Sequence, residues 1–329
     1  MMERHSKLLL LGAALLALLV SNFVQFDSYF LIVIITIGIN IILAVSLNLV
    51  NGYTGQFSLG HAGFMAAGAY VSAAVTTFGG ARWFEFFGGV NAFTTTSLFI
   101  VALLAGGLAA ALAGLIVGIP TLRLRGDYLA IATLGFGEII RVILQNTEKM
   151  GGSRGFSVGG TYTTFFWTYA LAAVTVYVVA NIVHSAYGRG FLTVRDDEIA
   201  AEAIGINTVK YKVVAFVLAA FFAGLAGGLY AHFVGYLSPE GFNFMKSIEI
   251  IVMVIVGGMG NTLGVVFAAV LLTLLPEWLR GVQEYRMVIY SLLLIILMLT
   301  RPQGLFGGLT WRPQNWLRKK STPPNAKTA

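Results

Sequence analysis

Hydrophobic positions along this chain fall into long, nearly unbroken runs, and neither the alternation of a half-buried strand nor the one-sided stripe of a surface helix dominates. Each run is close to the roughly 20 residues that a helix needs to cross the hydrocarbon of a bilayer. Seven uninterrupted runs cover approximately residues 8–26, 29–50, 57–77, 95–119, 128–146, 162–184 and 213–236. The pattern predicts an all-α polytopic membrane protein.

Two further runs follow, at about residues 247–275 and 286–300, and the first of them is interrupted by the sequence GGMGN. Glycine weakens a helix and permits a sharp change of direction. We therefore predict two half-length helices that turn back at Gly257, Gly258 and Gly260. The chain would then have about ten transmembrane segments, including these two glycine-broken half-helices.

The distribution of basic residues supports the broken run, because Lys and Arg accumulate on the cytoplasmic side of membrane proteins. A continuous helix would divide the basic residues evenly between the two sides. With the break, 14 of the 21 Lys and Arg residues lie inside: Arg4, Lys7, Arg123, Arg125, Arg189, Arg195, Lys210, Lys212, Arg301, Arg312, Arg318, Lys319, Lys320 and Lys327. Six lie outside, at Arg82, Lys149, Arg154, Lys246, Arg280 and Arg286, and Arg141 lies within the membrane. Residues 185–212, the basic tail 301–329 and the N-terminus are thus predicted to be cytoplasmic.

Composition agrees with one membrane domain over residues 1–329, since 57% of the residues are hydrophobic and 11% are charged. The net charge of +7 follows from the same basic bias and does not require a nucleic-acid partner. The absence of cysteine excludes disulfides, thiolate metal sites and cysteine nucleophiles. Arg4 and Lys7 before the first run also resemble a signal peptide, but no small-x-small cleavage site follows, so we expect a retained first span.

One polar stretch, RDDEIAAEAIGIN at residues 195–207, interrupts this pattern. Asp196, Asp197 and Glu198 are suited to a helix start, where carboxylates cap free N–H groups, and Gly205 is suited to its end. Ile199, Ala200, Ala203 and Ile204 would share one face, with Glu198, Ala201 and Glu202 on the other. So short a helix needs a surface to lie on. Its acidity favours a protein groove over lipid, because interfacial helices usually carry basic residues.

The stretch RDDEIAAEAIGINTVKYKVVAFVLAAFFAGLAG resembles the cytoplasmic loop and following helix of permease subunits of bacterial branched-chain amino acid ABC transporters, the LivM-like family. The resemblance extends to NGYTGQFSLGHAGFMAAGAY, RLRGDYLAIATLGFGEIIR and RPQGLFG. It implies an importer-type ABC permease fold with a pseudo-twofold internal repeat, in the bacterial inner membrane. It also implies import of branched-chain or related hydrophobic amino acids with four kinds of partner: a second permease, two cytoplasmic ATPase subunits, a periplasmic solute-binding protein and the lipid bilayer.

In that family the loop helix docks into a cleft on the ATPase. The resemblance implies this coupling role for residues 185–212, and within them for Arg195, Asp196, Asp197, Glu198, Ala201, Glu202 and Gly205. Importer permeases often show E-A-A-x-x-x-G at this place. Ala200, Ala201 and Gly205 fit that pattern, whereas Ile199 displaces the glutamate to position 198.

The chain lacks the G-x-x-x-x-G-K-[ST] loop that cradles nucleotide phosphates, so ATP is expected on a partner subunit and the chain itself is not expected to be an enzyme. GGSRG at residues 151–155 matches G-x-S-x-G but lacks the strand and helix of a nucleophile elbow. The histidines show no metal-ligand spacing, and we expect no bound cofactor. An ion-coupled secondary transporter is an alternative, with Glu138 and Arg141 as candidates, although an ion pair is favoured. A urea or short-chain amide ABC permease is another.

The translocation path is predicted from glycine-rich breaks with polar neighbours, because paired interruptions point to substrate sites in transporters. Packing by small residues is the simpler alternative for any one glycine, and His61 is also suited to a packing role. The predicted path residues are Gly52, Gly55, Gln56, Ser58, Gly60, His61, Gly257, Gly258 and Asn261.

Overall fold

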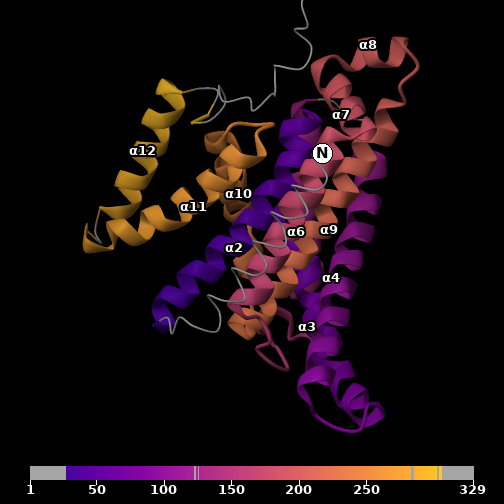
Figure 1. Cartoon of the computed structure of the whole chain (residues 1–329), viewed down its shortest axis with the longest axis vertical. Helices are drawn as coiled ribbons and strands as arrows, with labels where there is room; N and C mark the ends of the chain where they lie inside the picture. The colour runs from indigo at the N-terminus through magenta and orange to yellow at the C-terminus, as the bar shows by residue number, and fades with distance from the viewer. Residues whose placement is uncertain (1–26, 122–123, 125, 283–284, 302–303, 306–329) are drawn as a thin grey trace, which may run out of the picture.

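The computed structural model describes residues 27–121, 124, 126–282, 285–301, 304 and 305 of the 329-residue chain. Figure 1 shows a bundle of helices, which confirms the predicted all-helical class. The helices are α2 (Ser28–Asn48), the π-helix η1 (Leu49–Tyr53), α3 (His61–Phe86), α4 (Ala92–Thr121), α5 (Asp127–Gln145), α6 (Phe165–His184), α7 (Ala186–Asp196), α8 (Glu198–Ala203), α9 (Thr208–Val234), α10 (Phe244–Gly257), α11 (Thr262–Trp278) and α12 (Arg286–Thr300).

Within the described residues, five helical stretches are long and apolar enough to cross a membrane: Tyr29–Tyr53, α3, α4, α6 and α9. Helix α5 also follows a predicted run, but it carries Asp127, Glu138 and Arg141. The first predicted run, residues 8–26, and the tail after residue 305 lie outside the described part. The count of ten segments therefore stays a prediction.

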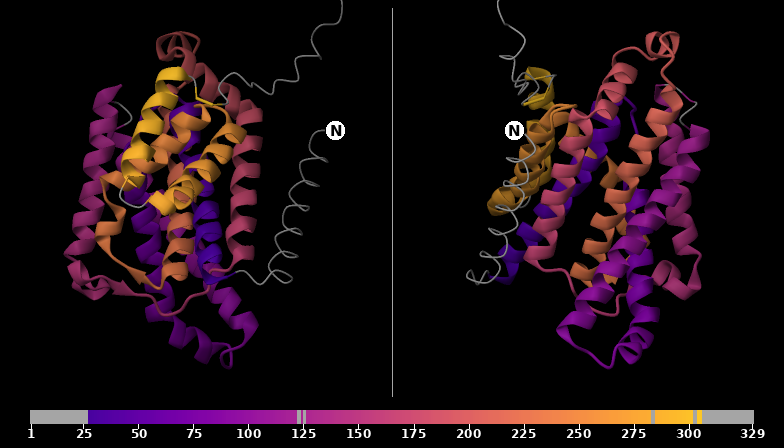
Figure 2. Two further views of the ribbon diagram at one scale, coloured as in Figure 1. Left: turned by 90° about the vertical axis from the view of Figure 1, so that its left-hand side faces the viewer. Right: turned by 45° about the vertical axis from the view of Figure 1, so that its right-hand side comes forward.

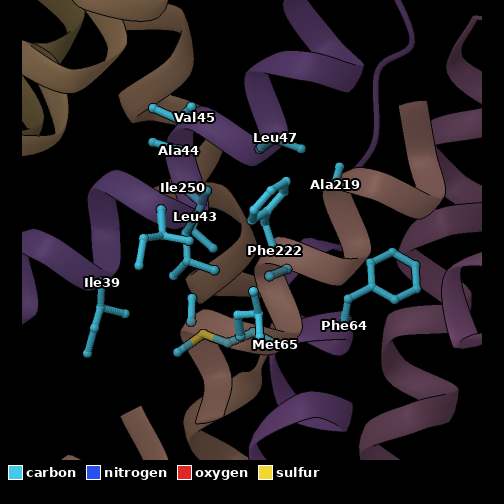
Figure 3. Close-up of a cluster of buried hydrophobic side chains, with 14 of the residues drawn as sticks. Ile39, Leu43, Ala44, Val45, Leu47, Phe64, Met65, Ala219, Phe222 and Ile250 are labelled. Atoms are coloured by element: carbon cyan, nitrogen blue, oxygen red, sulfur yellow. The ribbon is translucent and has the colours of Figure 1, made fainter. Parts of the chain in front are cut away.

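Helix α2 forms the centre of the bundle, where it contacts α6, α9, α10 and α11. Its residues from Ile35 to Asn48 are buried, apart from a half-buried Thr36. Figure 3 shows its aliphatic side chains meeting Met65 of α3, Phe222 of α9 and Ile250 of α10. A helix that is apolar on all sides is stable where apolar groups surround it completely, and here the neighbouring helices provide that surrounding.

Helices α3, α4 and α9 approach one another through glycines. A Cβ added at Gly68 of α3 would lie 2.2 Å from Cα of Gly224 of α9, and one added at Gly106 of α4 would lie 2.6 Å from the carbonyl oxygen of Gly68. Small residues allow this close approach and the van der Waals contact that drives helix association in membranes. The packing alternative for the glycines is therefore correct at Gly68.

The two ends of the bundle differ. Helix α8 lies at one end, and the turn between α3 and α4 projects from the other (Figure 1). Two short strands tie the loops at the second end together, since β1 (Phe156–Ser157) pairs antiparallel with β2 (Tyr236–Leu237) in the register Phe156↔Leu237. Three short 3-10 turns lie near that end: η2 (Glu148–Met150), η3 (Gly152–Arg154) and η4 (Pro239–Phe242); a fourth, η5 (Leu279–Val282), follows α11. Ser153 of the GGSRG sequence belongs to η3.

Helix α10 ends at Gly257 and α11 begins at Thr262, in the interruption that the sequence predicted. Gly258 and Gly260 have φ values of 95° and 82°, which favour glycine. The N-terminal end of α11 lies beside Asn48, and its C-terminal end lies at the start of α2, where Tyr29 donates a hydrogen bond to Glu277. Helix α11 thus runs antiparallel to α2, and Figure 2 shows α10, α11 and α12 grouped on one side of the bundle.

Candidate functional site

Helix α8 is held at its start as the sequence predicted. Asp197 is the N-cap, and its Oδ1 accepts hydrogen bonds from the backbone N–H groups of Ile199 at 2.9 Å and Ala200 at 3.0 Å. Gly205, just beyond the helix, has a φ of 85°, the left-handed conformation typical of a helix stop. Asp196 belongs to the preceding helix α7, which the hydrophobic pattern did not predict.

One face of α8 is attached to α9. The Nζ of Lys212 lies 2.6 Å from Oε1 of Glu198, and its side chain is only 6% exposed. Thr208 donates a hydrogen bond of 2.8 Å to Glu202, and Ala201 between these two bonds is fully buried. A direct contact of Ala201 with a partner protein was therefore a wrong expectation, because α9 already covers this residue.

The other face of α8 is exposed and apolar. Ile199 is 69% exposed and Ile204 is 72% exposed, and Ala200 and Ala203 between them are exposed as well. These four residues, here called the outward face of α8, are the group that the periodicity placed together. Large apolar side chains at the end of a membrane bundle, on a helix otherwise fastened to the protein, are typical of a docking surface.

The two glycine-rich interruptions meet beside α7, the helix that precedes α8. Asn48 Oδ1 accepts a hydrogen bond of 2.9 Å from the backbone N–H of Gly260, and the hydroxyls of Tyr53 and Thr262 are 2.8 Å apart. A Cβ added at Gly52 would lie 2.3 Å from the backbone nitrogen of Gly260. We call this contact the break junction: Asn48, Gly52, Tyr53, Gly260 and Thr262. Sequence analysis proposed the two breaks as a pair, and the structure brings them together.

Residues 54–60 follow the junction as a non-helical segment of alternating exposure, in which Gln56, Ser58 and Gly60 are buried and Gly55 and Phe57 are exposed. Leu59 N–H donates to Thr133 Oγ1 at 3.0 Å. Within the described residues, four buried polar atoms have no hydrogen-bond partner: Asn48 Nδ2, Asn51 Nδ2, Gln56 Oε1 and Ser58 Oγ. Asn48 is the last residue of α2, and the other three lie in the interruption that follows it. Such a group is unusual because buried polar groups are normally paired.

The remaining predicted path residues lie around these groups. His61, at the start of α3, is buried and its Nε2 lies 2.9 Å from Ser46 Oγ, which fits the packing role. Gly257 and Gly258 are buried at the end of α10. Asn261 caps α11, accepting a hydrogen bond of 3.2 Å from Gly264 N–H. Glu138 and Arg141 form the expected ion pair at 2.7 Å, with 35% and 26% of their side chains exposed.

Sequence reasoning missed three partners in this region. Arg195 Nη1 donates to the carbonyl oxygen of Gly52 at 3.3 Å, which joins α7 to the break junction. Lys212 and Asn48 were also missed as partners of Glu198 and Gly260. A signal existed for Asn48, because it is a polar residue inside an otherwise apolar run, where such residues need a partner.

The fold and the site define a class: a polytopic helical membrane protein of the transporter type, with a short helix of exposed apolar face at one end and two helix breaks that contact each other. The sequence profile of the family described as "Branched-chain amino acid transport system / permease component" matches residues 28–298. The chain belongs to this family of transport-system permeases.

Individual relatives agree. The chain is 37% identical to the high-affinity branched-chain amino acid transport system permease protein LivM of Salmonella typhimurium and to that of Escherichia coli, in each case across 81% of this chain and 67% of the relative. It is 22% identical to a probable LivM of Methanocaldococcus jannaschii, across 83% of this chain and 92% of the relative. LivH of Escherichia coli is 30% identical across 42% of this chain. No solved structure matches the chain.

Proposed function

We propose that this chain is one of two permease subunits in an ATP-driven importer of branched-chain amino acids. The outward face of α8 is the observation that carries the proposal, because it presents exposed isoleucines on a helix that the protein itself holds in place. A cytoplasmic ATPase subunit is its partner. A second ATPase docks on the second permease, and a periplasmic solute-binding protein delivers the amino acid.

The second permease packs against α5 in this proposal. The Glu138–Arg141 pair is partly exposed on a helix of the bundle, and exposing two charged groups to hydrocarbon is costly. A neighbouring protein surface removes that cost. Both LivM and LivH proteins are relatives of the chain, and two related permeases forming one pair is consistent with that observation.

The solute path runs along the first interruption in this proposal. The four unpaired atoms comprise two amide N–H donors, Asn48 Nδ2 and Asn51 Nδ2, and two oxygens that accept, Gln56 Oε1 and Ser58 Oγ. An amino-acid zwitterion carries a carboxylate that accepts hydrogen bonds and an ammonium group that donates them. The chemistry of the segment therefore suits the solute class, and Gly52, Gly55 and Gly60 permit the backbone to change shape around it.

The α8 end of the bundle is cytoplasmic in this proposal, and α10 and α11 are two half-helices that turn back at the break. A chain without native cysteine allows a clean test. Ala203→Cys at the outward face and Glu85→Cys at the α3–α4 turn are both exposed. In intact spheroplasts, an impermeant maleimide should label Glu85→Cys and leave Ala203→Cys unlabelled; the reverse pattern overturns the orientation.

Transport itself is tested in proteoliposomes that contain this chain with its neighbouring permease and ATPase. Uptake of leucine, isoleucine and valine should require ATP and the solute-binding protein. The chain alone should neither hydrolyse ATP nor accumulate the amino acid on a proton or sodium gradient. Gradient-driven accumulation by the single chain would assign it to the ion-coupled class instead.

The outward face is tested by Ile204→Arg, which adds a charge where a partner should pack. We expect the complex that contains this variant to lose its ATPase during purification, while the variant permease stays at normal membrane levels. The matched control is Ile119→Arg, another exposed isoleucine near the end of a different helix, α4. Retention of the ATPase by Ile204→Arg would remove α8 as the docking element.

A further inference from the structure

The break junction and the docking helix are joined by one side chain, that of Arg195 at the end of α7. Its Nη1 donates to the carbonyl oxygen of Gly52, and a Cβ added at Gly260 would lie 3.0 Å from the same Nη1. The guanidinium therefore touches both interruptions at the point where they meet.

The stem of Arg195 also packs on the segment after the junction. A Cβ added at Gly55 would lie 2.9 Å from Cγ of Arg195 and 3.5 Å from its Cβ. Gly55 has a φ of 68°, so glycine is favoured there both by conformation and by space. One side chain thus contacts the π-helical turn, the segment that follows it and the turn between α10 and α11.

The electrostatics of this contact suit an arginine. Gly52 lies in the last turn of the α2–η1 helix, where backbone carbonyls lack helical partners and the helix dipole is negative. The Nε and Nη2 groups of Arg195 donate to Oδ1 of Asp196 at 3.2 and 3.1 Å. That carboxylate orients the planar guanidinium and leaves Nη1 directed at the junction.

The connection to α8 is short. Asp197 alone, in an extended conformation with φ −158° and ψ 112°, joins the end of α7 to the start of α8. Two other bonds, Lys212–Glu198 and Thr208–Glu202, fasten α8 to α9. Movement of α8 would therefore be transmitted to α9 through these two side-chain bonds, and to the helix breaks through the contacts of Arg195.

We propose that Arg195 is the positioning residue that transmits movement of the ATPase-docked helix α8 to both helix breaks, and so couples ATP hydrolysis to opening of the path. The inference rests on the proposed function. It assigns Arg195 a role different from docking: the ATPase binds normally without it, but hydrolysis no longer responds to the solute.

The test uses the complete importer, with permeases, ATPases and solute-binding protein. Arg195→Met keeps much of the apolar stem and removes the guanidinium, and Arg189→Met on the exposed side of the same helix is the matched control. Arg195→Met should co-purify with the ATPase at the wild-type level, because the guanidinium is directed at the carbonyl oxygen of Gly52 and not at the outward face of α8. The increase in ATP hydrolysis caused by solute-loaded binding protein should fall about tenfold or more, and uptake should fall with it. This is the size of effect expected for losing a hydrogen bond from a charged group.

Arg195→Lys should retain part of the stimulated increment, because the charge remains but the fork of donors does not. Full stimulation and uptake by Arg195→Met overturn the inference. So does loss of the ATPase from the Arg195→Met complex, since the residue would then serve docking or folding. Failure of the wild-type complex to take up amino acids would instead refute the proposed function, which keeps the two failures distinct.

Discussion

The break junction and helix α8 both depend on glycine, but for opposite reasons. Gly52 is not among the glycines of positive φ, and a Cβ there would lie 2.1 Å from Asn48 Oδ1. Gly205 beside α8 has a φ of 85°, yet a Cβ there would meet nothing within 4 Å. The first glycine provides space between two packed segments, and the second provides a backbone conformation in the open. Substitutions at these two regions should therefore fail in different ways.

The largest effect is expected at the junction. Gly52→Ala would push Asn48 and the backbone of Gly260 apart, at a cost of about 3 kcal/mol for overpacking against backbone. The variant should reach the membrane at a reduced level and unfold at a lower temperature in detergent. Gly79→Ala on α3 is the control, because nothing lies within 4 Å of its Cβ. Unchanged thermal stability of Gly52→Ala would show that the interruptions separate readily.

The next effect concerns the two faces of α8. Ala201→Arg places a charge in a fully buried site and should lift α8 from α9, at a cost of at least about 2 kcal/mol. Ala203→Arg on the outward face should leave the unfolding temperature unchanged and release the ATPase. Measuring both quantities for both variants separates attachment from docking. Equal unfolding temperatures for the two variants would contradict the assignment of the faces.

A smaller effect is expected when the ion pair behind α8 is broken. Glu198→Gln leaves the Lys212 ammonium, 6% exposed, without its charged partner, at a cost of about 1.5 kcal/mol. The double variant Glu198→Gln with Lys212→Met should recover much of that stability, because no unpaired charge remains. A double-mutant cycle on detergent-solubilised protein measures the coupling, and strictly additive losses would contradict it.

The smallest effect is expected at Gly205. Gly205→Leu should cost about 1 kcal/mol, because a residue with a Cβ is strained in the left-handed conformation. Gly205→Asn is the control, since asparagine tolerates that conformation better. Both variants should insert normally, and only the leucine variant should weaken ATPase binding by misdirecting the end of α8. Co-purification yield measures this, and equal yields would show that the end of α8 does not contact the partner.

Much of the fold was predictable because membrane-spanning helices are continuous apolar runs, and their length is set by the bilayer. The runs from residue 29 onward match α2 to α6 and α9 to α12 to within a few residues at most ends. Helix α3 departs most from its run, ending at Phe86 instead of residue 77. Helix α7 was not predicted, since its glycines and arginines conceal the helical pattern.

The candidate site was predictable only in part. The cap at Asp197, the stop at Gly205 and the grouping of Ile199 with Ile204 follow from local rules of helix geometry, which depend on neighbours along the chain. Which face would be buried does not follow from such rules. The small apolar Ala201 could lie on either side, and the bonds of Glu198 and Glu202 to α9 turn its side of the helix inward.

By itself the sequence determined the approximate extent of the apolar helices from residue 29 onward, the two glycine-rich interruptions and the position of a short acidic helix between them. The length of an apolar run, its glycine content and its capping residues depend only on neighbouring residues, so the sequence of each segment is enough to predict them. Only the tertiary structure decided that the interruptions touch each other, that α9 covers Ala201 and that Arg195 bonds to Gly52. Those contacts join residues as many as 212 positions apart, and their partners are set by the packing of whole helices.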